Sequence, residues 1–125
     1  MPSVKWLDKP QDHDFPAAAD YLALVADAKT VAALTDKLRA GAIVHKKAKD
    51  ILRAAQLALL PIDNPYVAAD LAKIKKKQPL SPILLVQGEF ETGAPLQIAD
   101  GYHRVCASYY TNEDTDIPVI LAPRS

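Results

Sequence analysis

Cysteine and long apolar runs are the features that this chain most clearly lacks. Its one cysteine, Cys106, excludes an intramolecular disulfide and gives no sign of an oxidising compartment. No apolar run approaches the roughly 20 residues of a membrane helix. The N-terminal stretch MPSVKWLDKPQDHDF is too polar for a secretory signal. We therefore expect a soluble, cytoplasmic protein with no membrane partner.

An excess of either charge is absent as well. Fifteen Lys and Arg residues balance fifteen Asp and Glu residues, so the broad positive field of a nonspecific nucleic-acid binder is not expected. DNA is therefore not a favoured partner, although a local basic patch is compatible with this balance. Half of the 125 residues are hydrophobic, which is enough for one sizeable core, and we expect a single domain over residues 1–125.

Residues 1–45 are expected to form an N-terminal arm and two helices. The arm is polar and is tethered by Trp6 and Leu7. The first helix begins at Pro16, and its apolar residues at helical spacing are Ala18, Tyr21, Leu22 and Val25. The second helix covers about residues 30–40, and its apolar stripe is Val31, Leu34 and Leu38.

Residues 46–125 are expected to alternate helices and strands. Apolar spacing and turn residues predict helices over about 46–60, 64–77 and 102–110, and strands over 83–87, 96–100 and 117–121. The first two strands are expected to pair as a hairpin. The fold class predicted is therefore α/β, of the α+β kind: a small mixed sheet packed with helices, preceded by an all-helical segment.

The segment LQIADGYHRVCASYY, residues 96–110, has the pattern of an anion-binding junction. An apolar strand leads into Gly101, and His103 and Arg104 follow in the first turn of a helix. The first N–H groups of a helix have no internal partner and the helix dipole is positive there, so an anion is favoured. The Arg104 guanidinium suits phosphate or carboxylate, and His103 adds a further donor.

The stretch from about 50 to 122 resembles the ParB/sulfiredoxin superfamily, in particular its ParB-like N-terminal domain. The likeness rests on the LPIDNP turn, a helix ending in lysines, the SPILLV strand, the IADGYHRVCA junction and the closing IPVIL strand. The resemblance implies a nucleotide ligand. It also implies that Gly101, His103 and Arg104 contact phosphate groups.

Two departures from that superfamily narrow the chemistry. Tyr102 stands where sulfiredoxin has its catalytic cysteine, and a phenol cannot replace a thiolate as the nucleophile. Cys106 lies one helical turn further on and is expected in the core. The chain ends at Ser125, directly after the last strand, without the DNA-binding helix-turn-helix of the partitioning ParB proteins. Sulfiredoxin chemistry and centromere binding are therefore both disfavoured.

Several residues at the junction have two interpretations each. Asp100 caps the helix, or it holds the metal of a Mg²⁺–nucleotide or orients His103. Tyr102 is a packing residue, or it touches a base at the mouth of the site. Asp12, His13 and Asp14 resemble a metal cluster only by adjacency, and no metal-ligand spacing is found. The catalytic residues are unknown, with His103 and Arg104 as candidates for proton transfer and charge stabilisation.

The function expected from these observations is binding of a nucleotide or another phosphate-bearing ligand at the Asp-Gly-Tyr-His-Arg junction, residues 100–104. Phosphate hydrolysis or transfer is left open, since no nucleophile with a companion base can be identified. One alternative is a ParB-like nuclease that uses the lysine-rich helix as its DNA track. Another is a non-catalytic adaptor whose N-terminal helices dock a protein partner.

Overall fold

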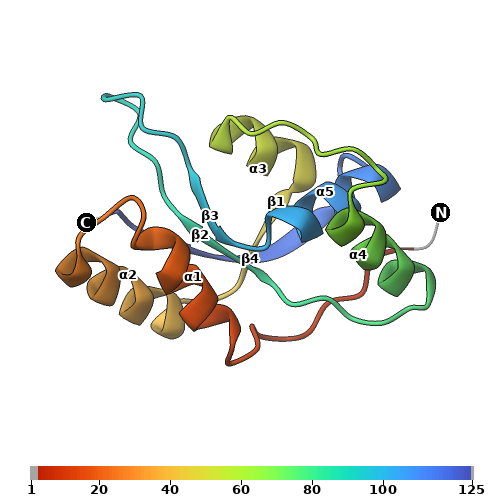
Figure 1. Ribbon diagram of the computed structural model, residues 1–125, viewed down its shortest axis with the longest axis horizontal. Helices are drawn as coiled ribbons and strands as arrows, with labels where there is room; N and C mark the ends of the chain where they lie inside the picture. Colours follow the sequence, from red (N-terminus) through yellow and green to blue (C-terminus); the bar gives the residue numbers. More distant parts are fainter. Residues whose placement is uncertain (1–2, 125) are drawn as a thin grey trace.

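The computed structural model describes residues 3–124, which form a four-stranded mixed sheet with helices on both faces (Figure 1). The strands are β1 (Val44–Lys47), β2 (Ile83–Val86), β3 (Gln97–Asp100) and β4 (Asp116–Ala122). They lie in the order β1-β4-β2-β3, with β4 antiparallel to β1 and parallel to β2, and β2 antiparallel to β3. The predicted α+β class and the β2–β3 hairpin are confirmed.

Five helices in the described part of the chain cover the two faces of this sheet. They are α1 (Asp14–Leu22), α2 (Ala28–Ala40), α3 (Ala48–Ala55), α4 (Pro65–Lys75) and α5 (Tyr102–Thr111). In Figure 1, α1 and α2 lie on one side of the strands and α3 and α5 on the other, with α4 packed against α5. Helices α1 and α2 precede all four strands in sequence, and they cover the face of the sheet opposite α3 and α5.

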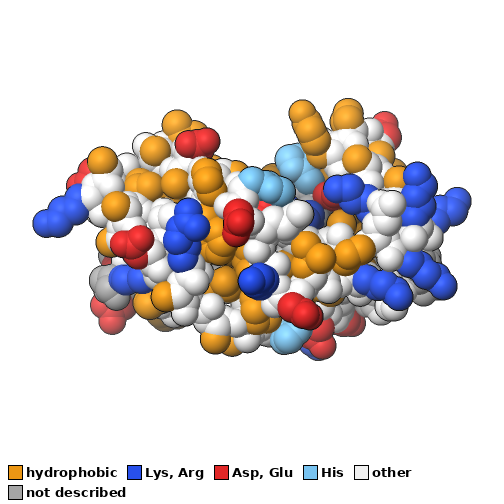
Figure 2. Space-filling view, turned by 90° about the horizontal axis from the view of Figure 1, so that it is seen from below, with side chains coloured by type: hydrophobic (Ala, Val, Ile, Leu, Met, Phe, Trp, Pro, Cys, Tyr) orange, Lys and Arg blue, Asp and Glu red, His pale blue; other side chains and the backbone are white. Residues whose placement is uncertain are grey.

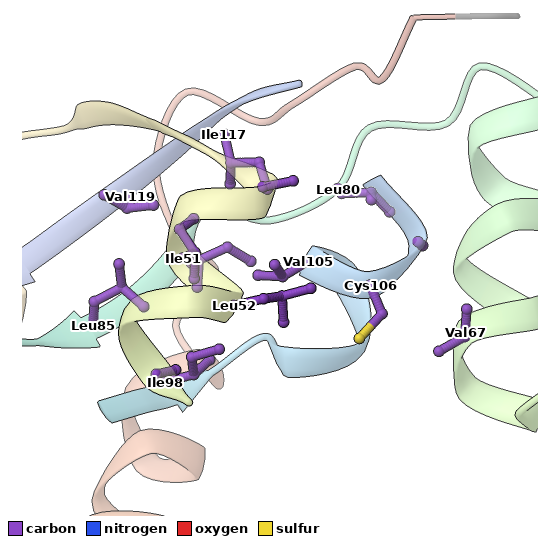
Figure 3. Packing of buried hydrophobic residues seen from close by; sticks show 14 of the residues in the cluster. Ile51, Leu52, Val67, Leu80, Leu85, Ile98, Val105, Cys106, Ile117 and Val119 are labelled. Atoms are coloured by element: carbon purple, nitrogen blue, oxygen red, sulfur yellow. The ribbon is translucent and has the colours of Figure 1, made fainter. Parts of the chain in front are cut away.

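Strand β2 is buried on both faces, as its run ILLV predicts. Ile83 and Leu85 belong to the hydrophobic cluster of α3, α4 and α5, whereas Leu84 and Val86 belong to the cluster under α1 and α2. Figure 3 shows the first of these clusters, which includes Ile51, Leu52, Val105 and Cys106. Instead of the single core that was expected, the buried residues form two layers separated by the sheet.

Local capping explains where two of the helices begin. The Asp27 carboxylate accepts a hydrogen bond of 2.8 Å from the Thr30 N–H at the start of α2. The Asn64 side chain accepts from the Tyr66 N–H, at 3.0 Å, at the start of α4, where proline at the first position has no N–H to leave unpaired. The apolar stripe predicted for α2 is buried: Val31, Leu34 and Leu38.

Strand β1 was missed, because residues 44–47 carry no apolar alternation. All four of its side chains are exposed, and the strand is held by pairing with β4 at the edge of the sheet. Edge strands with lysines on them are common in natural sheets because they discourage pairing between molecules. Lys46 and Lys47 were assigned to the following helix, which in fact begins at Ala48.

Helix α1 differs from the expectation at both ends. It begins at Asp14 instead of Pro16, and it ends at Leu22. The chain has left the helix before Val25, so Val25 is exposed although it was expected on the buried side, and Tyr21 is exposed at the last turn. The buried side of α1 consists of Asp14, Phe15, Ala18 and Leu22.

Hydrogen bonds hold two irregular segments of the chain against the rest of the protein. The N-terminal arm is tethered as predicted: Trp6 forms a bridge with Leu80, and the Leu7 N–H donates to the Leu80 carbonyl at 2.8 Å. Residues 57–61 are held by two tyrosines of α5. Tyr102 donates its hydroxyl hydrogen bond to the Ala58 carbonyl, and Tyr110 donates to the Leu60 carbonyl at 2.6 Å.

None of the helices within residues 3–124 combines the length and the apolar character needed to cross a membrane.

Candidate functional site

The junction joins β3, which packs against α1, to α5, which packs against α4. Strand β3 ends at Asp100, Gly101 takes a left-handed conformation with φ of 111°, and α5 begins at Tyr102. No side chain of the described residues caps α5, because its N-cap residue is glycine. Its first N–H groups are therefore available to an acceptor outside the helix.

Gly101 is required here by geometry. A Cβ at this position would lie 2.4 Å from Ile83 Cδ1 and 2.9 Å from Arg104 Nη2. Such separations are far inside van der Waals contact, and a φ of 111° is outside the regions open to residues with a side chain. The guanidinium of Arg104 therefore lies directly against the glycine at the start of α5.

Arg104 is held by an ion pair with Asp100. Its Nη2 donates to Asp100 Oδ2 at 2.9 Å and to the Pro82 carbonyl at 3.3 Å. The two side chains are only 18% and 17% exposed, so the pair is largely withdrawn from water. The Nε atom of Arg104 is buried and has no hydrogen-bond partner within the described residues. Part of the donor capacity of this guanidinium is therefore unused.

A pocket of about 290 Å³ opens beside this ion pair, between the junction and α4. Helix α4 and the junction supply its lining: Tyr66, Ala69, Asp70, Lys73, Asp100, Gly101, His103 and Arg104. Figure 2 shows a face of the molecule that is hollowed between two lobes, with histidine, acidic and basic side chains at the edge of the hollow. The same kinds of side chain line this pocket.

The carboxylates of the site lie in surroundings that disfavour their charge. Burial raises the pKa of Asp100, the Arg104 guanidinium partly offsets this rise, and the carboxylate of Asp14 raises it further. Burial also raises the pKa of Asp70, against the opposing effects of Arg104, Lys73 and His103. Asp14 comes from the first turn of α1 and is only 3% exposed. Helix α1 thus contributes a third acidic group, next to Asp100.

Replacing Asp14 with asparagine is expected to make the stability of the protein less dependent on pH. Because the pKa of Asp100 is raised in the native state, its contribution to stability is complete at low pH. It is lost as the pH rises from the ordinary value of 3.8 through the native pKa. Asparagine removes the carboxylate that raises the pKa of Asp100, so the unfolding free energy of the variant should fall less between low and neutral pH than that of wild type.

Urea unfolding of both proteins between about pH 3 and pH 8 measures this difference. A difference in unfolding free energy that stays constant over the whole range would show that the Asp14 charge does not act on Asp100.

The structure brings four of the five predicted site residues to the pocket. Asp100, Gly101, His103 and Arg104 line it. Tyr102 is not among the lining residues, and its hydroxyl is bonded to the Ala58 carbonyl. The interpretation of Asp100 as the cap of α5 is wrong, because its carboxylate pairs with Arg104 and the N-cap residue is Gly101.

Cys106 and the stretch Asp12, His13 and Asp14 do not line this pocket. Cys106 is fully buried in the hydrophobic cluster, and burial raises the pKa of its thiol. His13 lies 3.4 Å from Asp14, atom Nε2 to Oδ1, and is itself largely exposed. Across residues 3–124, no three His, Cys, Asp or Glu side chains form a group that could hold a metal ion.

The contribution of α4 to the pocket was missed. Tyr66, Asp70 and Lys73 face the junction, whereas from the sequence Lys73 was expected only as one of the lysines at the end of its helix. The signal was present in the spacing, since residues at i, i+4 and i+7 lie on one side of a helix. What the sequence could not supply was the packing of that side against α5.

Comparison with protein-family models, with curated proteins and with solved structures finds no match to this chain.

Proposed function

We propose that the pocket between α4 and the N-terminus of α5 binds a phosphate-bearing ligand, a nucleotide being the ligand class that the resemblance to the ParB/sulfiredoxin superfamily suggests. The observation that carries this proposal is the uncapped start of α5 at Gly101, which opens into a pocket lined by Lys73, His103 and Arg104. Free helix N–H groups together with cationic side chains are the usual means by which proteins hold phosphate.

Two acidic side chains, Asp70 and Asp100, also line the pocket, and negative charge on them opposes the binding of an anion. Asp100 is already paired with Arg104, and the pKa values of both Asp70 and Asp100 are raised by burial. A dianion placed between them makes protonation of these carboxyls still more favourable. Binding of phosphate is therefore accompanied by proton uptake, and the affinity is higher at acidic than at alkaline pH.

The pocket supplies few ligands of its own to a metal that accompanies a nucleotide. Magnesium in such sites is held by one or two carboxylates together with the phosphate oxygens. Of the two carboxylates in the pocket, Asp100 is occupied by its ion pair, whereas Asp70 is in no salt bridge with a described residue. One carboxylate does not make a metal site by itself, so any Mg²⁺ would enter with the nucleotide, held by its phosphate oxygens and by water, in keeping with the lack of a three-ligand group among residues 3–124.

Proton exchange is the one catalytic step that a pocket residue is suited to. His103 is the one imidazole that lines this pocket and can donate or accept a proton, and Arg104 can stabilise negative charge that develops on a phosphoryl group. No cysteine, serine or threonine lines the pocket. We therefore propose ligand binding alone. For hydrolysis or transfer of a bound phosphate, His103 and Arg104 are the candidate catalytic residues.

Substituting Lys73 with alanine is expected to weaken phosphate binding by about tenfold, the usual effect of losing one charge-assisted contact. Inorganic phosphate, tripolyphosphate and nucleotides are titrated into wild type and variant while the melting temperature is followed, with and without Mg²⁺. A ligand at 100 times its Kd stabilises the native state by about 2.7 kcal/mol, which corresponds to a rise of roughly 10 °C for a chain of this size.

The matched control is Lys75→Ala, which removes the same charge from the same last turn of α4 but outside the pocket. Equal loss of binding in the two variants would mean that binding depends only on the net charge of the protein, and it would contradict the assignment of the site. Absence of any phosphate-dependent stabilisation in wild type would overturn the proposal itself.

A further inference from the structure

An exposed aromatic side chain that lines the pocket is not among the phosphate contacts proposed above. Tyr66 lies in the first turn of α4 and is 68% exposed, although it lines the pocket. Its ring centroid lies 5.0 Å from that of His103, with an angle of 46° between the planes. Two neighbouring rings at the mouth of a polar pocket leave flat apolar surface facing the solvent.

The three chemistry-bearing residues of α4 follow one another in a fixed order along the pocket. Tyr66 comes first, Asp70 is one turn further, and Lys73 is almost one turn beyond that. With a rise of 1.5 Å per residue, the ends of this row are separated by about 10 Å along the helix axis. The row therefore runs from an aromatic ring through a hydrogen-bond acceptor to a cation.

The junction supplies His103 and Arg104 to the opposite wall of the pocket. His103 lies beside Tyr66, and His103, Arg104 and Lys73 all lie close enough to the Asp70 carboxyl to favour its charged form. Along α4, the Tyr66 ring and the Lys73 cation therefore lie on opposite sides of the Asp70 carboxylate. A ligand that fits has a planar ring, then hydroxyl groups, then an anionic group.

We infer that Tyr66, with His103 beside it, holds the planar base of a nucleoside phosphate, while Asp70 accepts hydrogen bonds from the sugar hydroxyls. The inference rests on the proposed phosphate site and goes beyond it, because it assigns the other two parts of the ligand to named residues. Stacking on an aromatic ring is tolerant of base identity. Tyr66 accordingly selects nucleotides over sugar phosphates without selecting one base.

The test compares nucleoside 5′-monophosphates with ribose 5-phosphate, which carries the same sugar and phosphate but no base. Calorimetric titration of wild type is expected to show nucleotides binding about tenfold more tightly than ribose 5-phosphate, the effect of one base–aromatic contact. In Tyr66→Ala this preference disappears while ribose 5-phosphate binds as before. In Tyr66→Phe the preference is kept.

A readout specific to stacking accompanies the titration. The base protons of the bound nucleotide are expected to shift upfield in proton NMR with wild type and Tyr66→Phe, and less so with Tyr66→Ala. The control is Phe90→Ala, which removes a fully exposed aromatic ring in the β2–β3 connection, outside this pocket, and is expected to change neither measurement.

The outcomes separate this inference from the function on which it rests. Nucleotides that bind no more tightly than ribose 5-phosphate, or a preference that survives in Tyr66→Ala, would overturn the role of Tyr66 and leave the phosphate site standing. Failure of ribose 5-phosphate, inorganic phosphate and nucleotides alike to bind would overturn both.

Discussion

Replacing Gly101 with alanine is expected to lower the free energy of unfolding by about 3 kcal/mol, from backbone strain and overpacking together. The backbone has φ of 111° at this position, and the added Cβ would lie 2.4 Å from Ile83 Cδ1. Ile83 is fully buried in the central strand β2, so it has no room to move aside. The other near atom belongs to the Arg104 guanidinium, which the methyl group would push away from its ion pair.

Gly93 provides the control for this experiment. It also has a positive φ, of 77°, but an added Cβ would meet no atom within 4 Å. Gly93→Ala should therefore cost only the backbone strain, about 1 kcal/mol. Urea unfolding of the three proteins gives the comparison. Equal losses in the two variants would mean that the close packing around Gly101 contributes nothing beyond its backbone conformation.

The contrast between β2 and β1 shows what the sequence could predict about the fold. The ILLV run of β2 is apolar at every position, which is typical of a strand covered on both faces, and this prediction is confirmed. The VHKK stretch of β1 is exposed throughout and is a strand only because its backbone pairs with β4. The hydrophobic pattern therefore predicted strands whose side chains are buried in the core. It did not predict β1, which is held only by its backbone pairing with β4.

A similar limit applies to the candidate site. The junction itself was local in sequence, and Asp100, Gly101, His103 and Arg104 could be identified from their order alone. Its partners come from elsewhere in the chain: α4 supplies the opposite wall of the pocket, and Asp14 reaches Asp100 from the first turn of α1. These approaches depend on how helices pack across a sheet, which spacing within one helix cannot show.

The Asp100–Arg104 pair illustrates the same point at the level of two residues. A spacing of four predicts contact when both residues are in one helix. Here Asp100 ends a strand and Arg104 lies in a helix, and they meet because Gly101 turns the chain sharply between them. From the sequence alone, a helix cap was a more natural expectation for Asp100 than an ion pair, because a cap requires only an aspartate just before a helix.

Replacing Arg104 with methionine is expected to cost about 3 kcal/mol of unfolding free energy, the lower end of the effect of breaking a buried ion pair. Methionine preserves much of the apolar volume of the arginine stem, so the loss comes mainly from the charge. Without the guanidinium, Asp100 keeps its burial and its neighbour Asp14 but loses its counter-charge. The Pro82 carbonyl loses a donor as well.

The double variant Asp100→Asn with Arg104→Met separates the structural role of this arginine from its role in binding. Removing both charges leaves no uncompensated carboxylate at position 100, so the stability should return to within about 1 kcal/mol of wild type. Phosphate binding should not return, because the cation at the start of α5 is still missing. Stability is measured by urea unfolding, and binding by the phosphate-dependent rise in melting temperature. A double variant that binds phosphate as wild type does would confine Arg104 to holding Asp100 and leave Lys73 and the helix N–H groups as the anion site.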